Sequence, residues 1–429
     1  MRKIGVSMCL LLVCVGVCAK TARFTFFRME TPLQLDHILT GERRLFLPRR
    51  ERPPGYRWPV SYRARYAVVL YKVSYVSVVP ERKGRPIVAT GLLAVPIVKD
   101  DRSLAVVSYQ HGTVYGKHAV PSYAFSRKNP SGYAQYAGAY ETRLMVAQYA
   151  GQGYVVMAAD YFGLGDSRQP EAYSVKGSEQ EACMGLYRAV KSFLATKGIR
   201  ESRLFLAGWS HGGLVTTAFL EKLQARHIAV AATFTAASPN DPFAALSAWM
   251  DQKARIDAVR HVTPLALTVF SFQHYYAVPG LARSVIRSRY YTLLKRIYDR
   301  DYRSRQARDR IYAAIGGSKT GLLQFLRRRY ASPAVLADST FGRLLARAET
   351  YREVFLSPVR MFYGTRDEVV PVALAKLAAD YQEAMGSHMI RMIRVRGGNH
   401  RGTFLTAVSQ SLAWFSALRR RWAPEPLPR

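Results

Sequence analysis

The chain has 429 residues, of which 49% are hydrophobic and 21% charged, so it can bury a substantial core and is neither disordered nor of low complexity. Its formal net charge of +34 favours anionic partners such as acidic lipid or lipopolysaccharide surfaces. The basic residues are spread over the whole sequence without a nucleic-acid-binding motif, so we expect no specific nucleic-acid partner. A general adaptation of the surface explains the charge equally well.

The first residues have the pattern of a secretory signal peptide. Arg2 and Lys3 precede an apolar run, residues 4–18, which stops at Ala19. The run is shorter than the roughly 20 residues that a membrane-spanning helix needs, so we prefer cleavage near Ala19 to an N-terminal anchor. The sequence therefore predicts a signal peptide over residues 1–19 and an exported protein, either periplasmic or secreted.

The cysteines limit how the exported chain is stabilised. Three of the four, Cys9, Cys14 and Cys18, lie in the predicted signal peptide, which leaves only Cys183. The mature chain is therefore expected to have no internal disulfide and to depend on core burial. Cys183 lies in an apolar helical pattern, which favours a packed thiol over a reactive one.

After an N-terminal arm expected to be irregular, residues 20–66, the pattern changes to strands and then to strands alternating with helices. Residues 73–80 and 87–97 are predicted as neighbouring antiparallel strands joined by a turn. Continuous apolar runs bounded by glycine and polar loops predict buried strands, and apolar residues at helical spacing predict the helices between them. The further expected strands are 103–112, 154–159, 204–210, 229–237, 359–364 and 389–398, and the expected helices are 141–153, 177–198, 211–225, 371–386 and 402–420.

This alternation indicates an α/β protein with a mostly parallel sheet covered by helices on both faces. The core is expected over residues 67–239 and 352–429. Between the two parts, residues 240–351 are helical in character and rich in arginine and tyrosine, which predicts a helical cap inserted into the core. Within the helix at 177–198, Ser178 followed by Glu181 has the pattern of a capping box.

The stretch LFLAGWSHGG places Ser210 between the end of a predicted strand and the start of a predicted helix. G-x-S-x-G alone is a weak pattern, but in this context the chain reverses so sharply that side chains at Gly208 and Gly212 would collide. The hydroxyl of Ser210 is then exposed above the sheet at a helix N-terminus, where free amides favour developing negative charge. We interpret Ser210 as a nucleophile.

A nucleophilic serine needs a base and an acid that orients it. His400 follows the last predicted strand in GGNHRG, at the carboxyl edge of the sheet where Ser210 must lie. His388 precedes the same strand and is therefore at the wrong edge. Asp367, in YGTRDEVVP, again follows a strand, and Glu368 is the fallback acid, expected to point to solvent.

The oxyanion of an acyl-transfer reaction needs two backbone donors. The first is the amide of His211, directly after the predicted nucleophile. The second is expected in SYQHGT, where Gly112 allows close approach of the backbone and the amide of Thr113 is our choice of donor. His111 has no companion ligands at metal spacing, so we expect it to shape this loop, and we expect no metal site.

These segments resemble the α/β-hydrolase superfamily and, within it, the branch of secreted esterases and secretory lipases. The similarity spans about residues 89–404 and includes ATGLLAVP, SYQHGT, GYVVMAADYFGLGDS, GWSHGG, YGTRDEVVP and GGNH. The resemblance implies an α/β-hydrolase fold with a variable cap, and hydrolysis of small-molecule or lipid esters by a Ser–Asp–His triad without a cofactor. The chain departs from the family in lacking the disulfides of some secreted relatives and in its arginine-rich cap, so the substrates of relatives cannot be transferred to it.

Three alternatives remain open on the sequence. A serine peptidase uses the same triad, and Glu141 or Glu179 would then bind the amino terminus of a peptide. An acyltransferase would pass the acyl group to an alcohol instead of water. A non-catalytic cationic binding protein on a hydrolase fold would explain the net charge directly.

Overall fold

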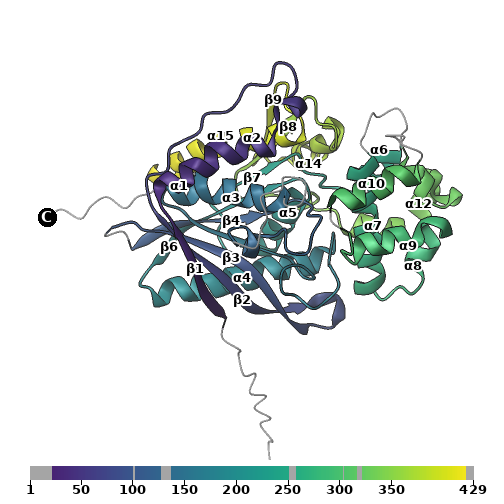
Figure 1. Ribbon diagram of the computed structural model, residues 1–429, viewed down its shortest axis with the longest axis horizontal. Coiled ribbons are helices and arrows are strands. Elements are labelled where there is room, and N and C mark those ends of the chain that lie inside the picture. The colour runs from purple at the N-terminus through teal and green to yellow at the C-terminus, as the bar shows by residue number, and fades with distance from the viewer. Residues whose placement is uncertain are drawn as a thin grey trace, which may run out of the picture.

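In the computed structural model, one nine-stranded sheet runs through the molecule, and a group of helices lies beside it (Figure 1). The structure describes residues 22–99, 102–126, 137–250, 258–302, 304–315 and 321–421. The predicted signal peptide at residues 1–19 lies outside these ranges. No helix among the described residues combines the length and the apolar character needed to cross a membrane.

The sheet has the strand order β1-β2-β3-β5-β4-β6-β7-β8-β9. The first three strands pair antiparallel, β3 pairs antiparallel with β5, and all the other pairs are parallel. The expected antiparallel pair is confirmed as β2 and β3. The strands are β1 (Arg23–Glu30), β2 (Val68–Val79), β3 (Arg85–Pro96), β4 (Ser103–Gln110), β5 (Val155–Ala159), β6 (Arg200–Trp209), β7 (Ala232–Ala236), β8 (Val359–Gly364) and β9 (Ile390–Val395).

Helices cover both faces of the sheet, as the sequence predicts. Central strands such as β5 and β7 are buried at every position, which explains their continuous apolar sequences. One face packs against α3 (Ala137–Tyr149) and α15 (His400–Arg421), and the other against α4 (Lys176–Thr196), α5 (His211–Gln224) and α14 (Val372–Ala384). Cys183 lies inside the second layer, buried and free, as expected.

The N-terminal segment differs from the expected irregular arm. Its first part is β1, which extends the sheet by pairing with β2. The chain then forms the short helices α1 (Pro32–His37) and α2 (Arg43–Phe46), which lie over the same face as α3 and α15 (Figure 1). Leu35, Phe46 and Leu47 are fully buried there, so this segment completes one of the two core layers.

The capping box expected at Ser178 is wrong. Helix α4 begins at Lys176, and no side chain caps its N-terminus. Ser178 instead donates a hydrogen bond of 2.6 Å from its hydroxyl to Glu81, and its amide donates to the same carboxylate. A tertiary partner from the β2–β3 hairpin therefore replaces the local cap.

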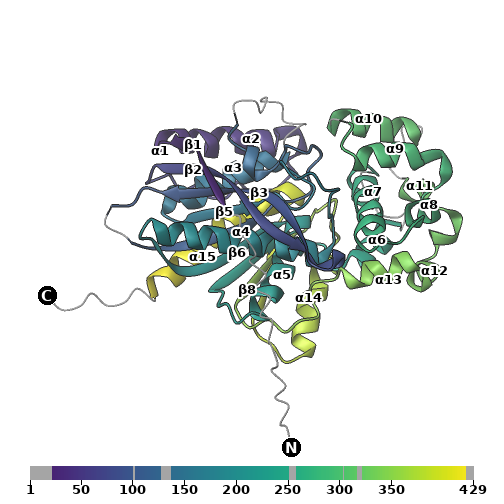
Figure 2. The same ribbon diagram turned by 90° about the horizontal axis from the view of Figure 1, so that it is seen from below.

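The described part of the insertion between β7 and β8 consists of helices and connecting loops, and its single isolated β-bridge joins Ile286 and Leu326. They gather at one side of the molecule, away from the sheet (Figure 2). The helices are α6 (Pro242–Met250), α7 (Ala258–Tyr275), α8 (Leu281–Val285), α9 (Ser288–Tyr298), α10 (Ser304–Ala314), α11 (Leu322–Phe325), α12 (Pro333–Asp338) and α13 (Thr340–Arg347). Most of their aromatic residues pack between helices, as in the stacked pair Phe270 and Tyr298.

Candidate active site

Ser210 lies in a sharp turn between β6 and α5. Its backbone has φ 56° and ψ −128°, a strained conformation for a residue with a side chain, and its amide donates a 2.9 Å hydrogen bond to the carbonyl of Ala236. A Cβ at Gly208 would come within 2.2 Å of the Gly212 carbonyl oxygen, and one at Gly212 within 2.0 Å of the Gln110 carbonyl oxygen. The turn therefore requires glycine at both positions, as the sequence suggests.

The structure brings Ser210, Asp367 and His400 together in one row. His400 Nε2 lies 2.9 Å from Ser210 Oγ, and His400 Nδ1 lies 3.1 Å from each carboxylate oxygen of Asp367. The side chains of His400 and Asp367 are only 5% and 2% exposed. Asp367 Oδ1 also accepts 2.9 Å hydrogen bonds from the amides of Val369 and Val370, which fix the carboxylate facing the imidazole.

Two further side chains hold the backbone of His400, the first residue of α15. Trp209, next to Ser210, donates a 3.0 Å hydrogen bond from its indole nitrogen to the His400 carbonyl. Glu368 accepts a 3.0 Å hydrogen bond from the His400 amide and forms a 2.8 Å ion pair with Arg260 of α7. The expectation that Glu368 points to solvent is therefore wrong, since it links His400 to the helical insertion.

The N-terminal segment also supports the turn that carries His400. Asn399 donates a 2.8 Å hydrogen bond to the carbonyl of Glu51, and Arg401 forms a 2.6 Å ion pair with the Glu51 carboxylate. The hydroxyl of Tyr56 donates to the carbonyl of Gly402 at 2.9 Å. These contacts join residues about 350 positions apart, and no local sequence signal predicts them.

The residues of the two expected oxyanion donors border the cavity beside Ser210. Thr113, in the loop after β4, and His211, the first residue of α5, line the same small cavity as Ser210. The first amides of a helix lack intrahelical partners, so the His211 amide can donate to a ligand. The loop before Thr113 is fixed by Gly112, whose amide donates a 2.8 Å hydrogen bond to Glu141.

Glu141 is fully buried beneath this loop. It accepts a second hydrogen bond, of 2.6 Å, from the hydroxyl of Tyr109. Burial raises the pKa of Glu141 to about 8, although both hydrogen bonds act in the opposite direction. A carboxyl group in so apolar a place supports the loop structurally; it does not face the cavity beside Ser210.

His111 and His211 are both buried next to this loop. Burial lowers the pKa of His111 to about 4, and its Nδ1 lies 2.8 Å from the Gly112 carbonyl oxygen, in agreement with the predicted loop-shaping role. The ring of His211 stacks on Tyr173 with 3.9 Å between centroids, and its Nε2 lies 2.8 Å from Glu179. Within the described ranges, no three His, Cys, Asp or Glu side chains are grouped so that they could hold a metal ion.

We call the space beside Ser210 the serine cavity; it has a volume of about 90 Å³ and is bordered by Thr113, Tyr173, His211, Trp249, Arg260, His400 and Arg401. The insertion contributes Trp249, which donates a 2.9 Å hydrogen bond to the carbonyl of Val369, close to Asp367. Past Tyr173 and His211 the cavity is followed by an apolar pocket under the insertion. This pocket is lined by Leu246, Leu265, Phe341 and Leu345 among others.

The carboxyl edge of the sheet thus carries a serine elbow after β6, an aspartate after β8 and a histidine after β9, under a helical insertion. This combination of topology and placement defines the class. The chain is an α/β-hydrolase-fold protein.

The comparisons with known proteins agree with this class. The family model described as serine aminopeptidase, S33, matches residues 130–296, a range that contains Ser210 but neither Asp367 nor His400. Among curated protein sequences, none matches the chain.

Solved structures resemble the chain over most of its length. The rice cell wall degrading esterase LipA from Xanthomonas oryzae is 18% identical, with a TM-score of 0.71, over 94% of this chain and 97% of that one. A protein from Legionella pneumophila is 19% identical, with a TM-score of 0.75, over 94% and 99%. Candida antarctica lipase A is 15% identical, with a TM-score of 0.63, over 84% and 79%. At these identities the likeness establishes the fold, and the esterase and lipase names belong to those proteins.

Proposed function

We propose that this chain is an exported serine hydrolase that cleaves carboxylic esters, with Ser210 as nucleophile, His400 as general base and Asp367 as the orienting acid. The observation that carries the proposal is the 2.9 Å contact between Ser210 Oγ and His400 Nε2, in line with the 3.1 Å contacts of His400 Nδ1 to Asp367. These distances are within reach of proton transfer. Esterase and lipase names among the structural neighbours support the same reaction class.

In this mechanism Ser210 Oγ attacks the ester carbonyl while His400 Nε2 takes its proton. Asp367, fixed by two backbone amides, keeps the proton of His400 on Nδ1 and stabilises the imidazolium that forms. His400 then protonates the leaving alcohol. Water, activated by the same histidine, attacks the acyl-enzyme, and the acid is released.

The amides of His211 and Thr113 would hold the negative charge of the tetrahedral intermediate. The contact of Gly112 with Glu141 supports this role, because it fixes the loop next to Thr113 without using the Thr113 amide. One donor of this kind contributes roughly 2.7–4 kcal/mol to transition-state stabilisation.

The side chains that line the serine cavity and the adjoining apolar pocket support a substrate that is the ester of an apolar acid. The serine cavity is followed by the pocket lined by Leu246, Leu265, Phe341 and Leu345, where an aliphatic or aromatic acyl group would be removed from water. Trp249 borders both spaces and would contact the acyl group near the reacting carbonyl.

A serine aminopeptidase is the second candidate, because the matching family model bears that description. An aminopeptidase needs a carboxylate for the amino terminus of its substrate. The described residues that line the serine cavity include no carboxylate, and they include the cations Arg260 and Arg401. Glu141 and Glu179, the candidates from the sequence, are fully buried and already bound to Gly112 and to Ser174. These observations favour the esterase.

Export is part of the proposal and rests on the signal-peptide pattern of residues 1–19. In its final compartment the strongly basic surface would favour contact with acidic lipid or lipopolysaccharide. N-terminal sequencing of the protein from cell fractions tests export. A periplasmic or secreted protein beginning at Lys20 is expected, and an unprocessed cytoplasmic protein would contradict it.

The hydrolytic activity is tested by comparing p-nitrophenyl esters of increasing acyl length with aminoacyl p-nitroanilides. We expect turnover of the esters, an optimum in acyl length set by the apolar pocket, and little turnover of the anilides. Preference for the anilides would favour the peptidase instead.

A further inference from the structure

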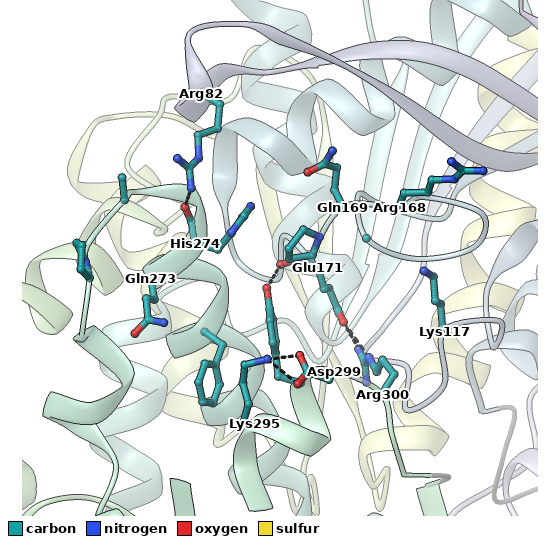
Figure 3. A pocket seen from close by; sticks show the side chains of 16 residues that line it. Arg82, Lys117, Arg168, Gln169, Glu171, Gln273, His274, Lys295, Asp299 and Arg300 are labelled. Carbon is teal, nitrogen blue, oxygen red and sulfur yellow. Dashed lines mark hydrogen bonds and ion pairs between the residues drawn. The ribbon is translucent and has the colours of Figure 1, made fainter. Parts of the chain in front are cut away.

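A larger cleft lies between the core and the insertion, separate from the serine cavity. It has a volume of about 690 Å³, within the usual range for a site that binds a small molecule. Figure 3 shows that its labelled side chains come from several segments, with Arg82, Lys117 and Arg168 on core segments and Lys295, Asp299 and Arg300 at the end of α9. We call this space the cationic cleft.

Two of the five cations in the cationic cleft are already neutralised. Arg300 pairs with Glu171, in a contact whose two side chains are only 7% and 5% exposed, and it also donates a 2.7 Å hydrogen bond to the carbonyl of Val114. Lys295 pairs with Asp299 one helical turn away. Glu171 and Asp299, the two carboxylates that line the cleft, are therefore already paired, and neither balances the charge of another cation.

The other three cations have no carboxylate partner among the described residues. Arg82 is half-buried and donates a hydrogen bond to the backbone carbonyl of His274, so its position is fixed although its charge is not balanced. Lys117 is half-buried and Arg168 is exposed at the rim. Burial and the charge of Arg82 lower the pKa of His274, whose neutral ring adds hydrogen-bonding capacity without charge.

The unpaired cations of the cleft repel one another, and an anionic ligand would remove this unfavourable electrostatic energy. Three like charges around one partly enclosed space repel one another more strongly than three charges spread over open surface. Arg168 carries a guanidinium group, whose donors match the oxygens of a phosphate, and Lys117, at the same end of the cleft, adds a compact charge (Figure 3). Phe270 and Tyr298, whose stacked rings are 2% and 7% exposed, add a small apolar area to the lining of the cleft.

We propose that the cationic cleft binds a phosphorylated small molecule, with Lys117 and Arg168 at one end of the cleft holding the phosphate and Arg82 at the other end, beside His274 (Figure 3). A phosphate monoester carries a charge of about −1.5 to −2 at neutral pH, which balances the unpaired charges of Lys117 and Arg168 better than the single charge of a carboxylate ligand would. The inference uses neither Ser210 nor the proposed reaction, and it therefore stands or falls independently of them.

The test measures binding of inorganic pyrophosphate to the purified full chain by isothermal titration calorimetry at low ionic strength. The variant Lys117→Gln/Arg168→Gln should bind at least about tenfold more weakly, because it loses two charge-assisted contacts. The matched control is Lys99→Gln/Arg226→Gln, which removes the same charge at exposed positions near the opposite edge of the sheet. The control should retain the wild-type affinity.

Absence of binding to the wild type, or an equal loss in both double variants, would overturn the proposal, because attraction by net charge alone would then suffice. If Lys117→Gln/Arg168→Gln does not fold, as judged by circular dichroism, Arg168→Glu at the exposed rim replaces it. Arg168→Glu should weaken pyrophosphate binding, and unchanged affinity would equally overturn the proposal.

A second arm distinguishes a soluble phosphate compound from a lipid headgroup. Phosphatidylcholine vesicles with and without phosphatidic acid are sedimented with wild type and both double variants. Cosedimentation that requires phosphatidic acid and is lost only with Lys117→Gln/Arg168→Gln indicates a headgroup. Pyrophosphate binding without such cosedimentation indicates a soluble ligand, and either result supports the phosphate site.

Discussion

The serine cavity and the cationic cleft are both lined by loops at the carboxyl edge of the sheet. They differ in how the charges of their side chains are balanced. Beside Ser210, the cations Arg260 and Arg401 are matched by Glu368 and Glu51. In the cleft, Arg82, Lys117 and Arg168 have no such match among the described residues. A site whose groups are already paired suits a neutral substrate and a reaction that develops charge at one oxygen, whereas unpaired cations suit a ligand that arrives charged.

Residues that are close together in the sequence line the two spaces. Glu171 faces the cleft, and Tyr173, two residues later, borders the serine cavity, where its hydroxyl lies 2.7 Å from Thr113 Oγ1. If the comparison holds, changes at Ser210 should affect catalysis alone, and changes at the cleft should affect anion binding alone.

The largest effect is expected from Ser210→Ala. Loss of the nucleophile should lower kcat for p-nitrophenyl esters by roughly 10⁴- to 10⁶-fold, because no covalent intermediate can form. The affinity for pyrophosphate, measured on the same preparation, should not change. Ester hydrolysis that survives Ser210→Ala would show that another group performs the reaction.

Asp367→Asn should lower kcat by roughly 10⁴-fold, because the amide favours the wrong tautomer of His400. Stopped steady-state assays with a short-chain ester measure the effect. Glu368→Gln is the matched control, since it alters the neighbouring carboxylate, which contacts the His400 amide and Arg260 and not the imidazole of His400 in the described part of the chain. A larger loss in the control than in Asp367→Asn would reverse the roles assigned to the two acids.

Glu141→Ala should lower kcat by about 10- to 100-fold, since the Gly112 amide loses its partner and the adjacent oxyanion loop shifts. Glu141→Gln keeps an acceptor for this amide and should retain most of the activity. Equal losses in the two variants would mean that the negative charge of Glu141, and not its hydrogen bond, matters.

The raised pKa of Glu141 also predicts a pH dependence of stability. The folded-state pKa of about 8 exceeds the value of 4.5 expected for this carboxyl group in the unfolded chain, so the folded chain binds the proton more tightly. This stabilisation is complete below pH 4.5 and is lost as the pH rises through 8. The Tm of the wild type should therefore fall relative to that of Glu141→Gln between these limits. A difference in Tm that is constant across this range would contradict the buried, protonated carboxyl group.

The smallest effect is expected from Trp209→Phe. This change removes the 3.0 Å hydrogen bond to the His400 carbonyl but keeps an aromatic ring in the core. A net loss of about 1 kcal/mol corresponds to a decrease in kcat of roughly fivefold. Unchanged kcat would show that Glu368 and the N-terminal segment hold His400 without Trp209.

Sequence alone predicted the parts of the site that depend on short-range patterns. Ser210, Asp367 and His400 each follow a strand, and strands of a parallel sheet end at one edge, so their convergence follows from strand order and loop position. The glycines at 208 and 212 were predictable because the turn itself excludes a side chain there.

The contacts that hold these residues in place were not predictable in the same way. Glu141 lies on a helix 29 residues after the Gly112 amide that it binds, and Glu51 lies about 350 residues before its partners. Ser178 had the local signature of a helix cap, but its tertiary partner Glu81 determined its role. Long-range hydrogen bonds produce no recognisable pattern in the sequence. Burial, in contrast, produces apolar residues at regular spacing, and sharp turns require particular residues such as glycine.

Reaction with a fluorophosphonate probe, followed by mass spectrometry of the digested protein, tests the role of Ser210 most directly. We predict one covalent adduct, on the peptide that contains Ser210, formed at neutral pH and strongly slowed in His400→Ala. An intact protein that does not react, or an adduct on a different serine, would contradict the proposed nucleophile.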